Sequence, residues 1–268
     1  SSGGSNIGIG YQALTNNTSA SYNTAVGYQA GYSNTTGQYS TLVGWTVGYN
    51  NTTGQLTGIG AQALKNNTTG SSNTSVGVNS MFTNSTGSQN TALGEAALQN
   101  NTTASYNTAV GYGAAFSNST GNTIDAFGGN TLYNNTTGQN NVGLGNSALY
   151  TNSTGSYNVA VGRDALKLST TASYGTAVGY QAGYANTTGS DLTVFGNAAG
   201  RSNTTGTLNT AVGSNAMYSN TTGGYNVAMG YQSLFNNTTG NYSTAVGYQA
   251  AYSTTTPGQN DAFGYQAV

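Results

Sequence analysis

Hydrophobic and polar positions along the chain follow one pattern that returns every 17 residues. In each copy an apolar residue comes directly before a glycine, and this glycine recurs sixteen times. Every step between these glycines is 17 residues, except the 16-residue step from Gly44 to Gly60. The consensus copy reads T-A-V-G-Y-Q-A-L-Y-S-N-T-T-G-x-Y-N. Self-similarity at a short fixed period indicates a repeat protein whose copies stack on one another.

The residue before the glycine is apolar in every copy, and we call this set the assembly stripe. Its members are Ile9, Val26, Val43, Ile59, Val76, Leu93, Val110, Phe127, Leu144, Val161, Val178, Phe195, Val212, Met229, Val246 and Phe263. Alternation along a strand sends the Ala and Gly of each copy to one face and the Thr and Val to the other. The small face fits the interior of a thin coil, so we expect the stripe to lie outside its own coil and to need a covering surface.

A period of 17 residues suits one turn of a narrow β-coil with two strands of four or five residues and two corners. A two-helix repeat needs more than about 30 residues, and abundant Gly, Asn, Thr and Ser disfavour helix. The sequence therefore predicts an all-β fold, a parallel β-solenoid (β-roll) of about sixteen 17-residue coils. We interpret residues 1–268 as a single repeat array and as an internal segment of a longer fibre. Because a thin coil buries little apolar area, we expect self-association as a homotrimer or polymer.

Composition argues against several classes of function. Charged residues make up 3% of the chain, which has four Lys and Arg together and neither His nor Cys. Nucleic-acid binding needs clustered cations, and the usual zinc and copper sites need His or Cys, so we expect neither partner nor cofactor of these kinds. No apolar run of about 18 residues is present, so we expect no membrane insertion. The five carboxylates lie far apart in the sequence, so we predict no catalytic or metal site and no enzyme.

The N-x-[ST] motif recurs at one corner of the coil, and we call its asparagines the corner asparagines. They are Asn17, Asn34, Asn51, Asn67, Asn84, Asn101, Asn118, Asn135, Asn152, Asn186, Asn203, Asn220 and Asn237. One interpretation is a row of glycan attachment sites along the edge of the coils. The other is a structural turn residue beside a threonine ladder, since Asn is favoured in turns for its own reasons.

Aromatic residues follow the glycine in half of the copies, and we call this set the first tyrosine column. Its members are Tyr11, Tyr28, Trp45, Tyr112, Tyr180, Tyr231, Tyr248 and Tyr265. The same position also accepts charged residues, so we expect it to be exposed and to offer a surface contact to sugars or proteins. The alternative is that the stacked rings shield the strand edges. Paired threonines also suggest an ice-binding face, although adjacent residues such as Thr35 and Thr36 alternate between faces.

The segment N-T-A-V-G-Y-Q-A, as in residues 23–30, resembles the repeats of YadA-like heads in trimeric autotransporter adhesins. It resembles the N-T-A-V-G-Y-Q-A-L…N-T-T-G repeats of bacterial and phage tail-fibre-domain proteins more closely. The resemblance covers essentially the whole chain. It implies a left-handed parallel β-roll, three chains wound side by side, and an extracellular adhesive shaft or head.

These observations lead to three functional hypotheses. The first is a structural extracellular fibre segment, an adhesin or tail-fibre shaft or head that attaches to a cell-surface receptor or to glycans by many contacts. The second is a self-assembling, glycosylated extracellular filament that forms a coating rather than binding a receptor. The third is an ice-binding β-solenoid. The first two place the chain outside the cell, on a cell surface or on a virion.

Overall fold

The computed structural model describes residues 3–255 and 258–268. Within those residues the chain is all-β, with sixteen short parallel strands in a β-solenoid. This confirms the predicted all-β parallel solenoid, with one strand for each of the sixteen copies of the repeat. The chain forms two compact units, the first ending at Thr137 and the second beginning at Gly138.

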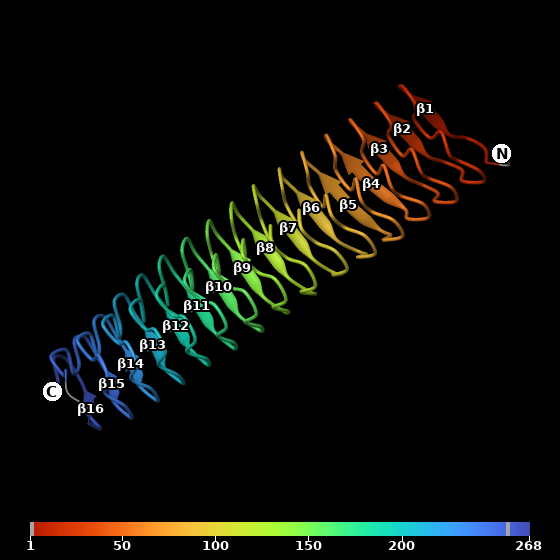
Figure 1. Ribbon diagram of the computed structural model, residues 1–268. Coiled ribbons are helices and arrows are strands. Elements are labelled where there is room, and N and C mark those ends of the chain that lie inside the picture. Colours follow the sequence, from red (N-terminus) through yellow and green to blue (C-terminus); the bar gives the residue numbers. More distant parts are fainter. Residues whose placement is uncertain (1–2, 256–257) are drawn as a thin grey trace. The chain divides into compact units, whose positions relative to one another are not determined.

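The first unit contains eight strands, one in each coil, and consecutive strands pair side by side (Figure 1). They are β1 Ile7–Ile9, β2 Thr24–Val26, β3 Thr41–Val43, β4 Leu56–Ile59, β5 Asn73–Val76, β6 Thr91–Leu93, β7 Thr108–Val110 and β8 Asp125–Phe127. Each residue pairs with the residue one repeat later, as Ala92 pairs with Ala109. The shorter repeat keeps this register because Val43 pairs with Ile59 across the 16-residue step.

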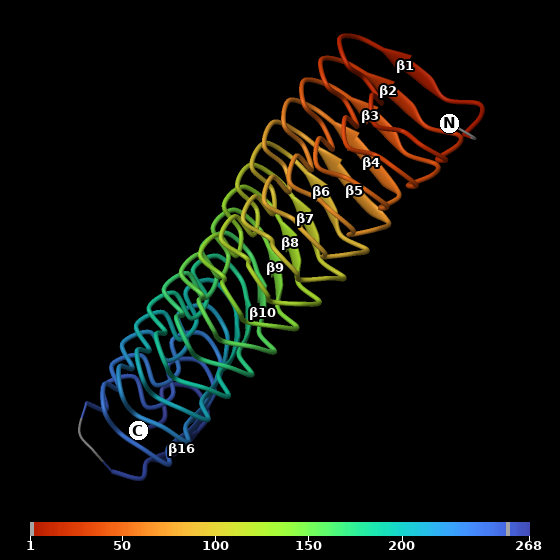
Figure 2. The ribbon, with the colours of Figure 1, turned by 45° about the vertical axis from the view of Figure 1, so that its right-hand side comes forward.

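The second unit repeats the arrangement with eight further strands. They are β9 Val142–Leu144, β10 Val159–Val161, β11 Thr176–Val178, β12 Thr193–Phe195, β13 Thr210–Val212, β14 Val227–Met229, β15 Thr244–Val246 and β16 Asp261–Phe263. Figure 2 shows each unit as successive coils, with the labelled strands β1 to β8 following one another along one side of the first unit and β9 and β10 along one side of the second. Pairing again joins equivalent residues, such as Val161 with Val178. The 17-residue period therefore sets the register within each unit.

Each coil has one regular strand rather than the two that the sequence predicts. The remaining residues are turns, yet they still bond to the next coil through the backbone. The N–H of Leu98 donates to the carbonyl oxygen of Ala114 (2.9 Å), and the N–H of Asn100 donates to that of Phe116 (3.0 Å). The prediction of two strands is wrong because inter-coil hydrogen bonds satisfy this backbone without extended dihedral angles.

Left-handed backbone occurs at positions that the sequence did not suggest. Gln29, Leu98 and Tyr106 have φ angles of 52°, 50° and 62°, and the equivalent residues of most coils behave alike. The corner residues Asn34 and Gly37, whose residue types tolerate positive φ, are absent from this group. Non-glycine residues in this region cost roughly 1 kcal/mol or more each, a cost that repeated inter-coil hydrogen bonds offset.

Small and large residues compensate one another in the interior. The alanines of the two alanine positions are buried, as Ala109 and Ala114 illustrate. In two coils that have a small residue in place of the usual Leu, Ala115 and Gly183, a large residue appears nine positions later; Ile124 follows Ala115 in this way. Gly183 is followed by Leu192, and a Cβ atom on Gly183 would lie 3.2 Å from Leu192 Cδ2. Conserving volume in this way keeps a thin interior close-packed.

The glycine that defines the repeat marks a close approach of consecutive coils. Gly111 has a φ of +134°, and a Cβ atom there would lie 2.6 Å from the carbonyl carbon and oxygen of Gly128. No side chain fits at that distance. The glycine is therefore required by both conformation and space.

Candidate interaction surfaces

The assembly stripe lies on the outer face of the strands, as predicted. In β7 the middle residue Ala109 is fully buried, whereas Thr108 and Val110 on either side are half-buried and point outward. Exposure of the larger members is substantial, with Ile9 at 60% and Leu144 at 48%. Each unit thus presents a continuous apolar row, with a threonine row beside it in most coils.

The first tyrosine column is exposed, as the sequence predicts. Tyr11 is 64% exposed and Tyr112 is 60% exposed. Where two tyrosines of the column are consecutive their rings stack, with centroids 5.3 Å apart for Tyr231 and Tyr248 and 5.1 Å apart for Tyr248 and Tyr265. In these stacks each ring covers a face of its neighbour, which leaves less ring surface for a bound sugar than isolated tyrosines offer.

A second exposed aromatic set escaped the sequence reasoning, and we call it the second tyrosine column. Its members are Tyr22, Tyr39, Tyr106, Tyr157, Tyr174, Tyr225 and Tyr242, all more than half exposed. Consecutive members again stack, as Tyr157 and Tyr174 do with centroids 5.2 Å apart and an interplanar angle of 4°. The signal was present in the 17-residue spacing of the next-to-last residue of the consensus copy, which is a tyrosine.

A third aromatic set is half-buried and carries three of the four cations, and we call it the aromatic–cation ladder. Its members are Tyr32, Tyr49, Lys65, Phe82, Gln99, Phe116 and Tyr133 in the first unit, and Tyr150, Lys167, Tyr184, Arg201, Tyr218, Phe235 and Tyr252 in the second. Arg201 lies between two rings, with its Cζ 5.2 Å from the Tyr184 centroid and 5.6 Å from the Tyr218 centroid. A ring between successive cations keeps like charges apart and adds cation–π attraction.

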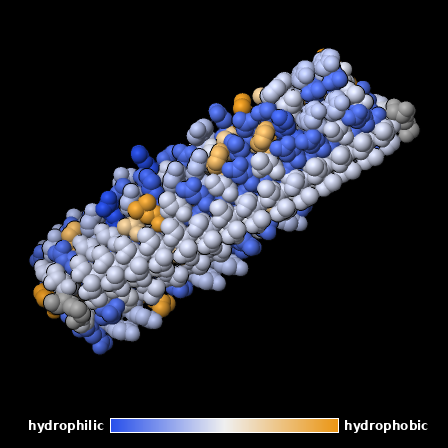
Figure 3. All heavy atoms as spheres, viewed as in Figure 1, coloured by the Kyte–Doolittle hydropathy of each residue, from blue (hydrophilic) through white to orange (hydrophobic). Residues whose placement is uncertain are grey.

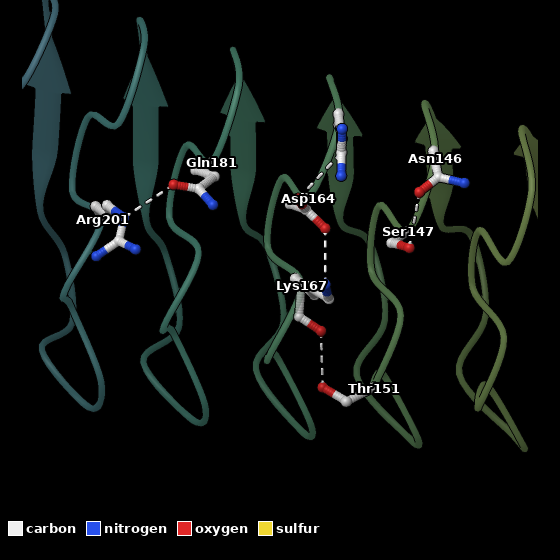
Figure 4. Close-up of polar contacts among 8 residues, drawn as sticks. Asn146, Ser147, Thr151, Asp164, Lys167, Gln181 and Arg201 are labelled. Atoms are coloured by element: carbon white, nitrogen blue, oxygen red, sulfur yellow. Dashed lines mark hydrogen bonds and ion pairs between the residues drawn. The ribbon is translucent and has the colours of Figure 1, made fainter.

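One charged cluster occurs in the second unit (Figure 4). Asp164 is 5% exposed, and its carboxylate bonds to Lys167 Nζ at 2.9 Å and lies 3.5 Å from Arg163 Nε. Arg201 Nε donates to Gln181 Oε1 at 3.0 Å. The hydrogen bond to Asp164 raises the pKa of the Lys167 ammonium above its ordinary value. Asp164 is thus buried rather than solvated, and two cations compensate its charge.

The corner asparagines lie inside the coil rather than on its surface. Twelve of the thirteen are at most 1% exposed, and Asn17 is half-buried. Asn101 Nδ2 donates to the carbonyl oxygen of Ala104 at 3.0 Å and to Asn84 Oδ1 at 2.7 Å. Because this nitrogen is buried and bonded, a sugar on it could not be accommodated in the folded coil. These contacts argue against the glycan interpretation of Asn17, Asn34, Asn51, Asn67, Asn84, Asn101, Asn118, Asn135, Asn152, Asn186, Asn203, Asn220 and Asn237, and favour the turn interpretation.

The threonines beside the corner asparagines separate as alternation predicts. Thr35 Oγ1 donates to the carbonyl oxygen of Thr52 at 3.0 Å, whereas the Thr36 side chain is exposed. Each coil therefore exposes a single threonine at this corner. A two-row threonine face does not form there.

The remaining surface offers small polar side chains, and Figure 3 shows a face that is mostly pale or blue with scattered hydrophobic spots. Among residues 3–255 and 258–268, no three His, Cys, Asp or Glu residues lie together as a metal site. The same residues include no helix long and apolar enough to cross a membrane.

Comparison with known proteins adds no relative. No family model matches the chain, and neither a curated protein nor a solved structure matches it.

Proposed function

We propose that this chain is a structural fibre segment that works by packing its assembly stripe against other copies of itself. The observation that carries the proposal is the continuous row of apolar side chains on the outer face of the strands. Members such as Ile59, Leu144 and Met229 are 42%, 48% and 44% exposed. Contiguous apolar surface of this kind is uncommon on monomeric soluble proteins and marks interaction sites.

Repetition explains how a weak contact becomes a stable one. Covering a half-exposed Val, Leu or Ile contributes roughly 1 kcal/mol, whereas association costs at least about 4 kcal/mol in lost freedom. One coil could not hold a partner. Eight coils in a unit add enough apolar contact to exceed that cost, which accounts for an array rather than a single module.

The partner that fits best is another copy of the chain in the same register. An identical stripe repeats at the same spacing between coils, so apolar residues of one copy meet apolar residues of the next along its length. Three chains around one axis form a closed arrangement, the number that the resemblance to adhesin heads and tail-fibre repeats implies. In this proposal the shaft or head stands outside the cell or on a virion and attaches through many weak contacts to a receptor or glycans.

Adjacent residues of β7 provide the test, because they point to opposite faces. Val110→Asp places a charge on the stripe, so we expect coils that fold but no longer associate, measured by circular dichroism and sedimentation. Ala109→Asp places the same charge in the fully buried interior and should prevent folding. Wild-type association by the folded Val110→Asp variant would refute the assembly face.

A further inference from the structure

Stacked pairs in the second tyrosine column suggest a covalent role. We propose that Tyr22 with Tyr39, Tyr157 with Tyr174, and Tyr225 with Tyr242 are sites at which consecutive coils are joined by dityrosine bonds. The oxidant is hydrogen peroxide used by a haem peroxidase. The proposal does not depend on association between chains.

Exposure makes these rings accessible to an oxidant. Tyr157 and Tyr174 are 54% and 58% exposed, and Tyr225 and Tyr242 are 52% and 60% exposed. A phenol on the surface can lose its hydrogen atom to a peroxidase intermediate without unfolding. Exposure also leaves each ring free to turn about its side-chain bonds as the new bond forms.

Stacking places the two rings of a pair next to each other and nearly parallel. The centroids are 5.3 Å apart in the Tyr22 pair, with an interplanar angle of 4°. In the Tyr157 pair they are 5.2 Å apart at 4°, and both residues have nearly the same φ, 61° and 60°. The two rings therefore leave the backbone in the same direction.

Backbone hydrogen bonds hold this alignment. The N–H of Tyr157 donates to the carbonyl oxygen of Gln139 at 3.0 Å, and the N–H of Tyr174 donates to that of Ser156 at 3.1 Å. Each tyrosine N–H thus bonds to the preceding coil, one residue before the equivalent position; for Tyr174 that residue is Ser156, which directly precedes Tyr157. Holding two reacting groups side by side makes their coupling effectively intramolecular and favours it over coupling between chains.

The chemistry balances with one molecule of hydrogen peroxide for each bond. Each phenol loses one electron and one proton to give a phenoxyl radical. The two radicals form a carbon–carbon bond between the ring positions next to the hydroxyl groups, and the two ring hydrogens move to the oxygens as both rings regain aromaticity. The peroxide takes up the two electrons and two protons and becomes two molecules of water.

The pairs recur every four coils, but at one of these places a single tyrosine stands without a second tyrosine beside it in the column. Tyr157 and Tyr225, the first members of their pairs, are four coils apart. The second members, Tyr174 and Tyr242, have the same separation. At the equivalent place in the first unit Gln89 stands in the column before Tyr106, which is 61% exposed. The chain therefore contains an exposed tyrosine that differs from the paired ones chiefly in having no tyrosine beside it in its column.

This difference gives a matched experiment on the intact protein. Dilute protein is treated with haem peroxidase and hydrogen peroxide, and cross-linked peptides are identified by mass spectrometry alongside dityrosine fluorescence. We expect bonds joining Tyr157 to Tyr174, and none joining Tyr106 to a residue of its own chain. Tyr157→Phe should abolish the first bond and leave the Tyr225 pair intact, while Tyr106→Phe should change no intrachain bond.

A gain of function provides the stricter test. Gln89→Tyr creates a new stacked pair, so we expect a bond between residues 89 and 106 that the wild type lacks. Equal yields of intrachain bonds at Tyr106 and at the paired tyrosines would overturn the proposal. So would failure of folded Gln89→Tyr to form the new bond, or bonds that occur only between chains.

Discussion

The corner asparagines are the feature whose energetic role can be worked out most directly, and Asn101→Ala is the decisive change. Its amide donates to Asn84 Oδ1 (2.7 Å) and to the carbonyl oxygen of Ala104 (3.0 Å). Its Oδ1 accepts a hydrogen bond from Asn118 Nδ2 at 3.2 Å. The side chain is fully buried, so water cannot replace these partners in the folded coil.

Removing three hydrogen bonds sets the expected magnitude. Each contributes roughly 0.5–1.5 kcal/mol to net stability, so we expect Asn101→Ala to lower the free energy of unfolding by about 3 kcal/mol. Two of the partners keep other bonds, since the Ala104 carbonyl still accepts from Asn90 Nδ2 and Asn118 Nδ2 still donates to the Gly121 carbonyl. Asn84 Oδ1, however, loses its donor in the buried corner, which adds to the loss. The turn itself keeps the bond from the Asn101 N–H to the Leu98 carbonyl.

Urea denaturation followed by circular dichroism measures this difference, with the slope compared between variants to check that unfolding stays cooperative. Thr103→Ala is the matched control, because Thr103 lies at the same corner with an exposed side chain and should change stability by less than about 0.5 kcal/mol. Hydrogen exchange at the corner amides should be about 100-fold faster in Asn101→Ala if the effect is local. Equal stability of the two variants would refute the structural role of the ladder.

Three further changes test other contacts. Ser169 interrupts the row of corner asparagines, and its buried Oγ has no hydrogen-bond partner, so Ser169→Asn should raise stability by about 1 kcal/mol in urea; a lower midpoint would show that the corner has no room. Gly111→Val should abolish folding, because its Cβ would lie 2.6 Å from the carbonyl of Gly128; a wild-type circular dichroism spectrum would contradict the close approach of the coils. The pKa of Lys167 is raised by its hydrogen bond to Asp164, so the pair stabilises the fold below the ordinary pKa of 10.5 and loses this effect as pH rises through the higher folded pKa. Wild type should therefore lose more stability than Asp164→Asn on passing from about pH 9 to about pH 12, and parallel losses would show that the pair contributes nothing.

Much of the fold could be predicted because one period governs it. A fixed 17-residue spacing brings Val76, Leu93 and Val110 into one column, and alternation around Ala109 places Val110 outside. Those two arguments predicted the solenoid, the register and the outward position of the stripe. They depend only on strand geometry, which the 3-residue strands obey.

The sequence could not reveal what the turns do with their side chains. An N-T-T-G corner looks like a surface turn because Asn, Thr and Gly are polar or flexible. In a stack, however, the asparagine amides of successive coils lie within hydrogen-bonding distance of one another. Asn84 and Asn101 can therefore be buried, because their side chains hydrogen-bond to each other. The prediction of a second strand in each coil was wrong for a related reason. Residues such as Gln29 and Leu98 have left-handed backbone there, and their residue types ordinarily favour other conformations, so the sequence does not reveal it.

The proposal that the assembly stripe joins copies of the chain is tested most directly by cryo-electron microscopy of the purified protein, at a resolution that separates neighbouring coils. The account predicts several chains side by side, three around one axis, with Val110 and its equivalents covered where the chains meet. Single chains, or assemblies in which the stripe faces solvent and another surface forms the contact, would contradict it.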